Sequence, residues 1–366
     1  DVFRGKTVLL PCDDPEWSNF TRYFAAKFDE LGLKKLISTS YAPDAKKMKL
    51  LAEPSLFEKE APQFDPQKAQ TKGKIFVLEK DHTGDGHINI DDLEWEYLEG
   101  DGDFKSKEVT QLRNEADIII TNPPFSLFRE FLAWIVEAHK QFIIIGNMNA
   151  ITYKETFPLI KDNKMWLGYS IHSGDREFQV PDEYPLTAAG WRIDDNGRKF
   201  IRVKGVRWFT NIDHGRRHEP LPLMTMADNL RFSKHKELKG KTAYDRYDNY
   251  DAIEVPFTDA IPSDYDGVMG VPISFLDKYC PEQFEILRFR KGNDDKDLVV
   301  NGVSPYFRIL IRHVEILGIS LELGIKKPDN LPKEKQGGPA FYIKMGTDYN
   351  RMYCRLAIRR KLTIDN

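Results

Sequence analysis

Hydrophobic positions in the first 150 residues follow two alternating patterns. Short, continuous apolar runs suit buried parallel strands, and between them apolar residues recur every three or four positions, as on one face of a helix. The predicted strands are residues 6–11, 36–41, 75–78, 93–98, 116–121 and 141–146. Strands that alternate with helices predict an α/β fold built on a largely parallel sheet.

Two amphipathic helices are predicted between these strands. The first carries an apolar stripe from Trp17 to Leu31 and begins near Asp14, which can cap it or contact a ligand, and Pro15. The second runs from Phe128 to His139. Each helix connects two predicted strands, and in such units ligands bind at the carboxyl ends of the strands.

Beyond about residue 158 the pattern changes to short alternating segments with many turn signals, such as 191–193 and 200–203, which predicts a mixed, β-rich region. A chain of 366 residues exceeds the usual size of one core. We therefore predict two domains with an insertion in the first, and we weigh whether part of the second packs back on the first. These segments are the core 1–158, its insertion and hairpin 44–100, the second region 159–366, and its candidate packing segment 252–290.

Composition narrows the class of protein. The chain is 41% hydrophobic and 30% charged, which is typical of globular proteins. Its longest apolar runs are too short to cross a bilayer, and no signal-peptide pattern opens the sequence. Its three cysteines have no CxxC spacing, so we expect neither a disulfide framework nor a metal site. These features predict a cytoplasmic protein without a membrane segment.

Charge is unevenly distributed along the chain. Residues 1–160 contain 20 Lys and Arg against 27 Asp and Glu, whereas the remaining 206 residues contain 34 against 30. This asymmetry suggests that the first part handles a cationic or neutral small ligand while the second meets a polyanion. Ordinary variation of surface charge is the alternative interpretation.

The segment Asn122-Pro123-Pro124-Phe125 directly follows a predicted buried strand and precedes a predicted helix. Two prolines stiffen the loop and leave carbonyl oxygens as acceptors. The Asn side-chain oxygen and a proline carbonyl can together accept both hydrogens of an exocyclic amino group, and the Phe ring can stack on the attached base. The motif therefore predicts a clamp for a planar amine, with a rigid proline turn as the alternative.

Five segments together resemble the adenine-specific DNA methyltransferases of the EcoRI modification type. They are residues 12–20, 121–130, 146–153, 208–211 and 265–272, and the resemblance extends from residue 8 to about residue 290. It implies a Rossmann-like core that binds S-adenosylmethionine, a mixed, β-rich C-terminal target-recognition region, and duplex DNA as substrate. In this family the target adenine is rotated out of the helix.

The resemblance also implies roles for individual residues. Asn122, Pro123, Pro124 and Phe125 are expected to form the catalytic clamp. The wider class has a glycine-rich turn after its first strand, which this sequence lacks, so side chains are expected to take its place. The expected cofactor-binding residues are Cys12, Asp13, Ser18, Asn19, Thr39, Ser40, Tyr41, Asp103 and Phe104.

Basic residues interleaved with aromatic residues follow the catalytic motif in the sequence, where a target-recognition segment is expected. The expected DNA-binding residues are Arg198, Lys199, Arg202, Lys204, Arg207, Arg216 and Arg217. Solvated side chains are the alternative for half or more of them. The run 81–92 partly resembles a calcium loop, but Thr83 and the short Asp92 occupy ligand positions, so we favour a turn.

These observations predict a site-specific DNA adenine methyltransferase in the cytoplasm of a bacterium or encoded by a phage. Duplex DNA is the expected partner, and a restriction endonuclease acting on the same site is a further candidate. Two alternatives stay open because the clamp fits any planar amino group and the glycine turn is missing. One is an RNA or protein-glutamine methyltransferase, and the other is an inert nucleic-acid-binding relative.

Overall fold

The computed structural model describes residues 2–14, 18–42, 61–170, 175–180, 182, 186, 190–247, 251–290, 341–345, 348–352 and 355–361. The chain divides into two compact units, and each is described by itself. The first unit comprises residues 1–156 and 165–212, and the second comprises residues 157–164 and 213–366. Residues 165–212 thus belong with the N-terminal unit, whereas the sequence pattern placed them in the second region.

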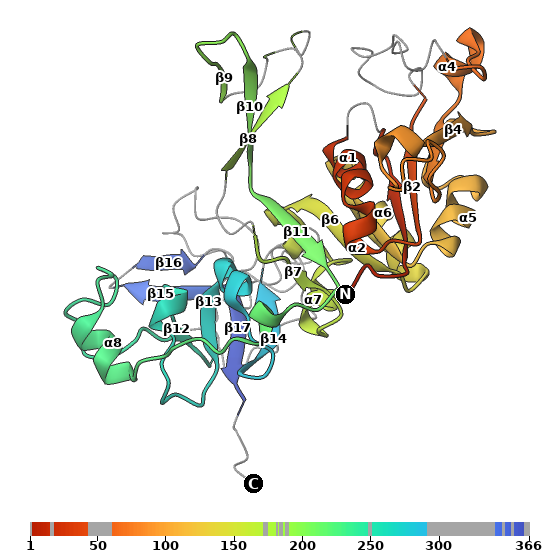
Figure 1. The fold of residues 1–366 in the computed structure, drawn as a ribbon. Helices are drawn as coiled ribbons and strands as arrows, with labels where there is room; N and C mark the ends of the chain where they lie inside the picture. Colours follow the sequence, from red (N-terminus) through yellow and green to blue (C-terminus); the bar gives the residue numbers. More distant parts are fainter. Residues whose placement is uncertain are drawn as a thin grey trace, which may run out of the picture. The chain divides into compact units, whose positions relative to one another are not determined.

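An eight-stranded sheet forms the centre of the first unit (Figure 1). Its four central strands are parallel, and most of their residues are buried, as is usual for parallel strands. In spatial order they are β2 (Lys35–Ser40), β1 (Thr7–Pro11), β5 (Ile118–Thr121) and β6 (Gln141–Asn147).

Antiparallel strands extend this sheet at both ends. Beyond β2 lie β3 (Lys74–Leu78) and β4 (Glu94–Tyr97), and beyond β6 lie β11 (Val206–Thr210) and β7 (Trp166–Leu167). The result is a mixed α/β sheet with a parallel centre, which is compatible with a Rossmann-like core.

Side chains on both faces of the central strands are buried. Val8 and Leu10 pack with Phe24 and Phe28 in one hydrophobic cluster. Leu9, which points to the opposite face, is also fully buried. Both faces of the sheet are therefore covered, and what remains open to ligands is the edge formed by the strand ends.

Helices connect the strands of the first unit and contact them. They are α1 (Asn19–Ala26), α2 (Phe28–Leu31), α4 (Pro66–Thr71), α5 (Lys107–Glu115) and α6 (Phe128–Glu137), with the short 3-10 helices η2 (Ile90–Asp92), η3 (Phe125–Leu127) and η4 (Met148–Thr152). The predicted first helix is divided at Lys27, and its predicted start at residues 15–17 lies outside the described residues. Of the predicted insertion and hairpin, 44–100, residues 44–60 also lie outside them.

The order of the central strands creates a topological switch point. The chain passes from β1 to β2 on one side of β1, and it later returns to the other side as β5. Connections therefore leave the ends of β1 and β5 in opposite directions. In open α/β sheets, ligands bind at such a point.

A separate three-stranded antiparallel sheet also belongs to the first unit. It consists of β8 (Asp175–Val180), β10 (Lys199–Lys204) and β9 (Trp191–Ile193) in that order. The register places Phe178, Ile201 and Trp191 opposite one another, and therefore on one face. Phe178 and Trp191 are 41% and 49% exposed.

The second unit contains a mixed four-stranded sheet and a two-stranded sheet. The first has the order β12 (Ile253–Glu254), β13 (Met269–Pro272), β17 (Arg355–Arg360) and β14 (Phe284–Arg290), and the second pairs β15 (Phe341–Met345) with β16 (Asp348–Met352). Its helices are α7 (Phe157–Lys161), α8 (Met226–Phe232), η5 (Gly215–His218), η6 (Thr258–Ala260) and η7 (Ile273–Lys278).

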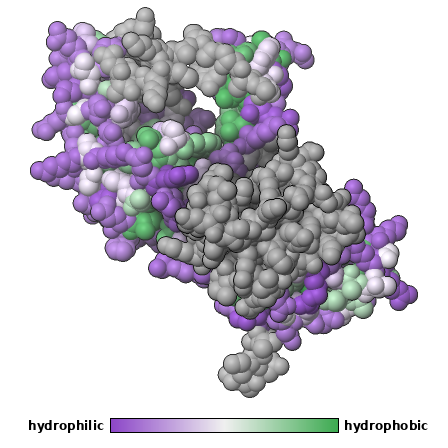
Figure 2. All heavy atoms as spheres, turned by 180° about the vertical axis from the view of Figure 1, so that it is seen from behind, coloured by the Kyte–Doolittle hydropathy of each residue, from purple (hydrophilic) through white to green (hydrophobic). Residues whose placement is uncertain are grey.

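The face of the molecule in Figure 2 is mostly hydrophilic where its residues are coloured, with a few separate hydrophobic patches. Within the described part of the chain, none of the helices combines the length and apolar character that crossing a bilayer requires.

Candidate active site

The turn after β1 takes a backbone conformation that side chains rarely adopt. Cys12 has a φ of 114°, although it is not glycine, and its N–H donates to the Thr39 carbonyl of β2 at 3.1 Å. The sequence therefore places a cysteine where the backbone conformation favours glycine. Strained residues of this kind persist where surrounding contacts hold them, and they concentrate at functional sites.

Cys12 faces solvent, yet protein surrounds it on most sides. Its side chain is exposed, but desolvation, followed by the negative charges of Asp13 and Asp103, raises its pKa. The Cys12 thiol therefore stays neutral at physiological pH, and the negative charges of Asp13 and Asp103 lie near it.

Asp13 is buried at the end of β1 and connects several elements. Its carboxylate accepts hydrogen bonds from the Ser18 hydroxyl at 2.7 Å and from the Thr121 hydroxyl at 2.5 Å. Its backbone carbonyl accepts from the hydroxyl of Thr21 at 3.0 Å and from that of Ser38. Burial raises the pKa of Asp13 to about 6, and the two hydroxyl donors oppose this shift.

Two other predicted cofactor residues stand at the start of α1. Ser18 caps this helix, because its hydroxyl accepts from the N–H groups of Phe20 and Thr21. Asn19 is the first helical residue and is exposed. Both residues therefore lie close to Asp13 in the fold, but the side chain of Ser18 already serves the helix and Asp13.

The end of β2 lies against a glycine-containing loop at residues 100–103. The Ala42 N–H donates to the Asp101 carbonyl at 2.8 Å, and a side chain at Gly102, whose φ is +84°, would overlap the Ser40 carbonyl. Desolvation, followed by the charges of Asp101 and Asp103, raises the pKa of Tyr41. The loop thus brings two carboxylates to the strand end where the resemblance implies cofactor binding.

Two predicted cofactor residues at this strand end, Thr39 and Ser40, are buried. Phe104 is buried as well, and its ring packs edge-on against Phe131 at 5.1 Å and Trp134 at 5.6 Å between ring centroids. Aromatic packing therefore explains the burial of Phe104. Contact of these three side chains with a cofactor stays a prediction.

The Asn122 to Phe125 loop follows the end of β5, next to the end of β1. Asn122 is exposed, Pro123 is buried, and Phe125 is 38% exposed although its side chain is large and apolar. The Pro124 carbonyl accepts the Leu127 N–H at 2.9 Å, which closes the η3 turn. The acceptors that remain for a clamp are therefore the Asn122 side chain and the Pro123 carbonyl.

The switch point brings together the predicted catalytic loop and the predicted turn after β1. The sequence did not identify Thr121, Thr21, Ser38 or Gly102 as parts of this site. Thr121 lay within the recognised motif, but its role depends on a partner more than 100 residues away. The signal that could have pointed to Thr121 is its place as a hydroxyl residue at the end of an apolar strand.

The expected DNA-binding residues fall into different environments. Arg207 and Arg217 are buried, with 3% and 8% exposure, and their guanidinium groups bond within the protein, to the Val206 carbonyl and to Asp213 respectively. DNA contact by these two residues stays a prediction, and their burial does not favour it. Lys204, in contrast, is exposed on β10.

Several of the remaining basic residues already have acidic or carbonyl partners. Arg198 pairs with Asp194 at 2.7 Å, Lys199 donates to the Asp182 carbonyl, and Arg216 lies 3.7 Å from Glu219. Arg202 is exposed and lies near the charge of Glu177. DNA contact by these residues stays a prediction.

The calcium-like run is a turn whose carboxylates bind backbone N–H groups. Asp92 accepts from His82 and Thr83, each at 2.8 Å, and Asp81 accepts from Gly84 at 2.5 Å and Gly86 at 2.8 Å. The carboxylates thus stabilise the loop itself. Among the described residues, no three His, Cys, Asp or Glu side chains gather in a group that could hold a metal ion.

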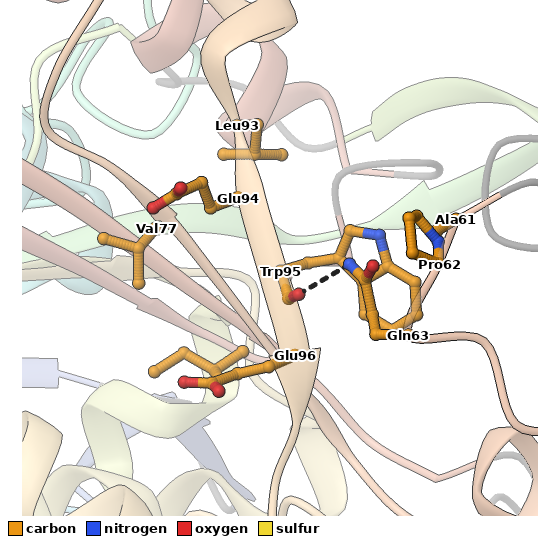
Figure 3. A pocket seen from close by; sticks show the side chains of 9 residues that line it. Ala61, Pro62, Gln63, Val77, Leu93, Glu94, Trp95 and Glu96 are labelled. Carbon is orange, nitrogen blue, oxygen red and sulfur yellow. Dashed lines mark hydrogen bonds between the residues drawn. The ribbon is translucent and has the colours of Figure 1, made fainter. Parts of the chain in front are cut away.

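A hollow of about 880 Å³ lies along the edge of the sheet, at β3 and β4 (Figure 3). Gln63 donates to the Trp95 carbonyl there at 2.9 Å, and Glu94 and Glu96 contribute carboxylates. None of the predicted catalytic or cofactor residues lines this hollow. The predicted site at the switch point and this hollow are therefore separate places in the first unit.

Comparison with known proteins identifies the family of this chain. The family described as adenine-specific methyltransferase EcoRI matches residues 1–361. The chain is 45% identical to the Type II methyltransferase M.EcoRI of Escherichia coli over 311 residues, which cover 85% of this chain and 87% of the relative.

Two mycoplasma proteins are also similar to this chain. It is 32% identical to the Type II methyltransferase M.MgeORF184P of Mycoplasma genitalium, over 86% of this chain and 90% of the relative. It is also 32% identical to M.MpnI of Mycoplasma pneumoniae, over 78% and 76%. No solved structure matches the chain. The chain therefore belongs to the EcoRI family of adenine-specific methyltransferases and is a DNA adenine methyltransferase.

Proposed function

We propose that this enzyme transfers a methyl group from S-adenosylmethionine to the exocyclic amino group of an adenine flipped out of duplex DNA. The observation that carries the proposal is the meeting of two segments at the switch point. The strained Cys12 turn ends β1, and the Asn122 to Phe125 loop ends the neighbouring β5. A donor site and an acceptor site on adjacent strand ends suit transfer between two bound molecules.

The residues around the β1 turn fit a positively charged donor. S-adenosylmethionine, when bound, supplies a methyl group on a positively charged sulfur that a nucleophile can displace. Asp13 lies under the turn, and Asp101 and Asp103 influence the pKa of Tyr41 beside it. We propose that Cys12, Tyr41 and Asp103 border the donor, while the negative charges near Cys12 and Tyr41 favour a cationic ligand.

We propose that the loop after β5 holds the acceptor base. Asn122 and the Pro123 carbonyl accept the two amino hydrogens of adenine and align its nitrogen. Phe125, partly exposed, offers its ring for stacking on the flipped base. Because the adenine amine is a weak nucleophile, alignment and polarisation of its N–H bonds are what the loop contributes.

We propose that the β-rich region after residue 158 recognises the target sequence. Lys204, one of the exposed cations on the β8–β10–β9 sheet, supports contact with phosphates. This proposal includes a division of labour, with catalysis in residues 1–158 and target recognition in residues 159–366. It also includes packing of residues 252–290 on the core and a companion endonuclease that acts on the same site.

Substitution of Asn122 tests the clamp. Asn122→Ala removes one acceptor that is needed during transfer, so we expect methyl transfer to duplex DNA to fall about 100-fold or more. Affinity for S-adenosylmethionine, measured by calorimetry, is expected to stay within about threefold of the wild-type value, because the donor is held by other residues. Ser126→Ala, in the same exposed loop, is the matched control and should retain activity. An Asn122→Ala enzyme with full activity would contradict the clamp.

A competition among acceptors tests the substrate. The wild-type protein is incubated with methyl-labelled donor and with duplex DNA, RNA or protein in separate reactions. We expect label only in DNA, on adenine, at one recurring sequence that sequencing of modified DNA identifies. Label in RNA or protein would favour the alternative amino-methyltransferases, and absence of donor binding would favour an inert relative.

A further inference from the structure

The ends of β1 and β5 are joined by side chains where their backbone pairing stops. The β1–β5 register includes Val8 with Ile118 and Leu9 with Ile119, and it ends there. On its other side β5 stays paired with β6 as far as Thr121 and Ile144. On the β1 side, therefore, something other than the backbone ladder must fix the last residues of β5.

The Thr121 hydroxyl makes that connection. It is fully buried and donates to Asp13 at 2.5 Å, and the Pro11 carbonyl lies 3.3 Å away as a weaker acceptor. Thr121 directly precedes Asn122, the proposed clamp residue. A shift of the Thr121 backbone would therefore carry the clamp with it.

The second carboxylate oxygen of Asp13 extends the connection to α1. It accepts from Ser18, which caps that helix. One carboxylate thus joins the end of β1, the end of β5 and the start of α1. Each oxygen already accepts a hydroxyl hydrogen bond, so Asp13 is arranged to hold protein segments rather than to contact a ligand directly.

Building the connection from a buried carboxylate is not the most stable choice. A buried charge that has hydroxyl donors but no cationic partner is costly, and apolar side chains would pack the same space at lower cost. A strong, directional acceptor gives something that apolar packing does not, because two charge-assisted hydrogen bonds fix positions closely. This points to a need for accurate placement at this site.

We propose that Asp13 is a positioning residue, whose carboxylate sets the Asn122 to Phe125 loop against the donor-binding end of β1 through Thr121. The inference rests on the proposed function, because it assumes a donor at β1 and an acceptor at the loop. Misplacement of reacting groups by about 1 Å can cost about 100-fold in rate. Asp13 thus acts on transfer without touching either reactant.

Substitutions at Thr121 and Asp13 in the full chain test this inference. Thr121→Val keeps the shape but removes the hydroxyl, and Thr121→Ser keeps the hydroxyl as a rescue variant. We expect Thr121→Val and Asp13→Asn to lower the single-turnover rate of methyl transfer by about 10- to 100-fold. Affinities for S-adenosylmethionine and for duplex DNA should stay within about threefold of wild type. Thr121→Ser should keep a rate close to that of wild type.

A double-variant cycle adds a measure that general destabilisation would not reproduce. If Asp13 acts through Thr121, the Asp13→Asn/Thr121→Val enzyme should be no slower than Asp13→Asn alone. A double variant whose rate loss equals the product of the two single-variant losses would overturn the inference. So would a Thr121→Val enzyme with the wild-type rate, or an Asp13→Asn enzyme whose rate loss is matched by lost donor affinity, which would make Asp13 a ligand of the donor.

Folding and the proposed function are controlled separately. Thermal unfolding is recorded for every variant, and if Asp13→Asn does not fold, the Thr121→Val and Thr121→Ser pair decides the question. A wild-type enzyme that methylates no DNA would overturn the proposed function and this inference with it. An active wild-type enzyme with unaffected Thr121→Val transfer would overturn the inference alone.

Discussion

At the scale of single residues, the turn after β1 combines two unfavourable features. Cys12 has a positive φ without being glycine, and Asp13 places a carboxylate in a buried position. Each lowers stability, and both lie beside the proposed donor site. Concentrated strain and buried charge are expected where a site must be held ready for its ligands.

The strain at Cys12 predicts a difference between two small substitutions. Both Cys12→Gly and Cys12→Ala remove the thiol, but glycine tolerates a φ of 114° and alanine does not. We expect Cys12→Gly to be more stable than Cys12→Ala by about 1 kcal/mol, because relief of strain exceeds the extra freedom of glycine in the unfolded chain. Denaturant unfolding of the two variants measures this. Equal stability would mean that the turn is not strained.

The buried carboxylate of Asp13 predicts how stability changes with pH. Its pKa rises from 3.8 to about 6 on folding, so the native state holds this proton more tightly than the unfolded chain does. The cost of burying the charge is absent below pH 3.8, grows as pH rises, and is complete above about pH 6. Asp13 should therefore lower stability by roughly 3 kcal/mol between these limits.

Asp13→Asn provides the reference for that measurement, because asparagine does not titrate. The free energy of unfolding of the wild type minus that of the variant should fall as pH rises from 4 to 7. A difference that stays flat, or that rises, would contradict the burial of an ionisable Asp13. Using the difference removes the contributions of other titrating groups.

At the scale of elements, apolar periodicity was enough to predict strands and helices but not their partners. The runs 6–11, 116–121 and 141–146 became β1, β5 and β6 with small changes in their ends. The same pattern could not show that β11, about 60 residues after β6, pairs with it. Pairing depends on tertiary contacts, and these do not repeat along the sequence.

The site was predictable to a similar degree. The Asn122 to Phe125 motif was recognisable because it is local, and the structure places it directly after β5, as predicted; its role as a clamp stays a prediction. The positive φ of Cys12, the burial of Phe104 and Arg207, and the Asp13–Thr121 bond were not predictable. Each of them depends on residues far away in sequence that pack against the site.

The loop at residues 100–103 predicts a contrast between two glycines. Gly102 and Gly84 both have positive φ, at +84° and +76°, but only at Gly102 would a side chain overlap another backbone, at the Ser40 carbonyl. We expect Gly84→Ala to cost about 1 kcal/mol through strain alone. Gly102→Ala should cost about 1–3 kcal/mol more, because the loop must move from β2.

Affinity for the methyl donor should also differ between the Gly102 and Gly84 variants. Displacement of the loop moves Asp103 away from Tyr41, so Gly102→Ala should weaken affinity for S-adenosylmethionine by about tenfold or more, corresponding to about 1.4 kcal/mol. Gly84→Ala should leave that affinity unchanged. If calorimetry gave the two variants equal affinity, the loop at 100–103 would not be part of the donor site.

At the scale of the whole molecule, the contrast in charge between the two ends of the sequence does not translate directly into a DNA-binding face. The three-stranded sheet carries many of the basic residues, but acidic partners accompany them, as in the pairs Arg192–Glu177 and Arg198–Asp194. Contact with phosphates depends on which basic side chains are exposed and not on the total number of basic residues. Lys204 is exposed on β10, and it is therefore the best test of this surface.

Lys204→Ala and Arg198→Ala each remove one positive charge from the same sheet, so their effects on long-range attraction should be equal. They differ in that Arg198 already forms a bond to Asp194 at 2.7 Å. If Lys204 contacts a phosphate, its loss should lower DNA affinity about two- to fivefold in 0.1 M salt. It should also reduce the slope of log affinity against log salt by about 1, independently of DNA sequence.

Arg198→Ala should change the slope less, and binding isotherms for both variants at four salt concentrations provide the comparison. Equal slopes for the two variants would show that only net charge matters here and that the sheet makes no direct phosphate contact through Lys204.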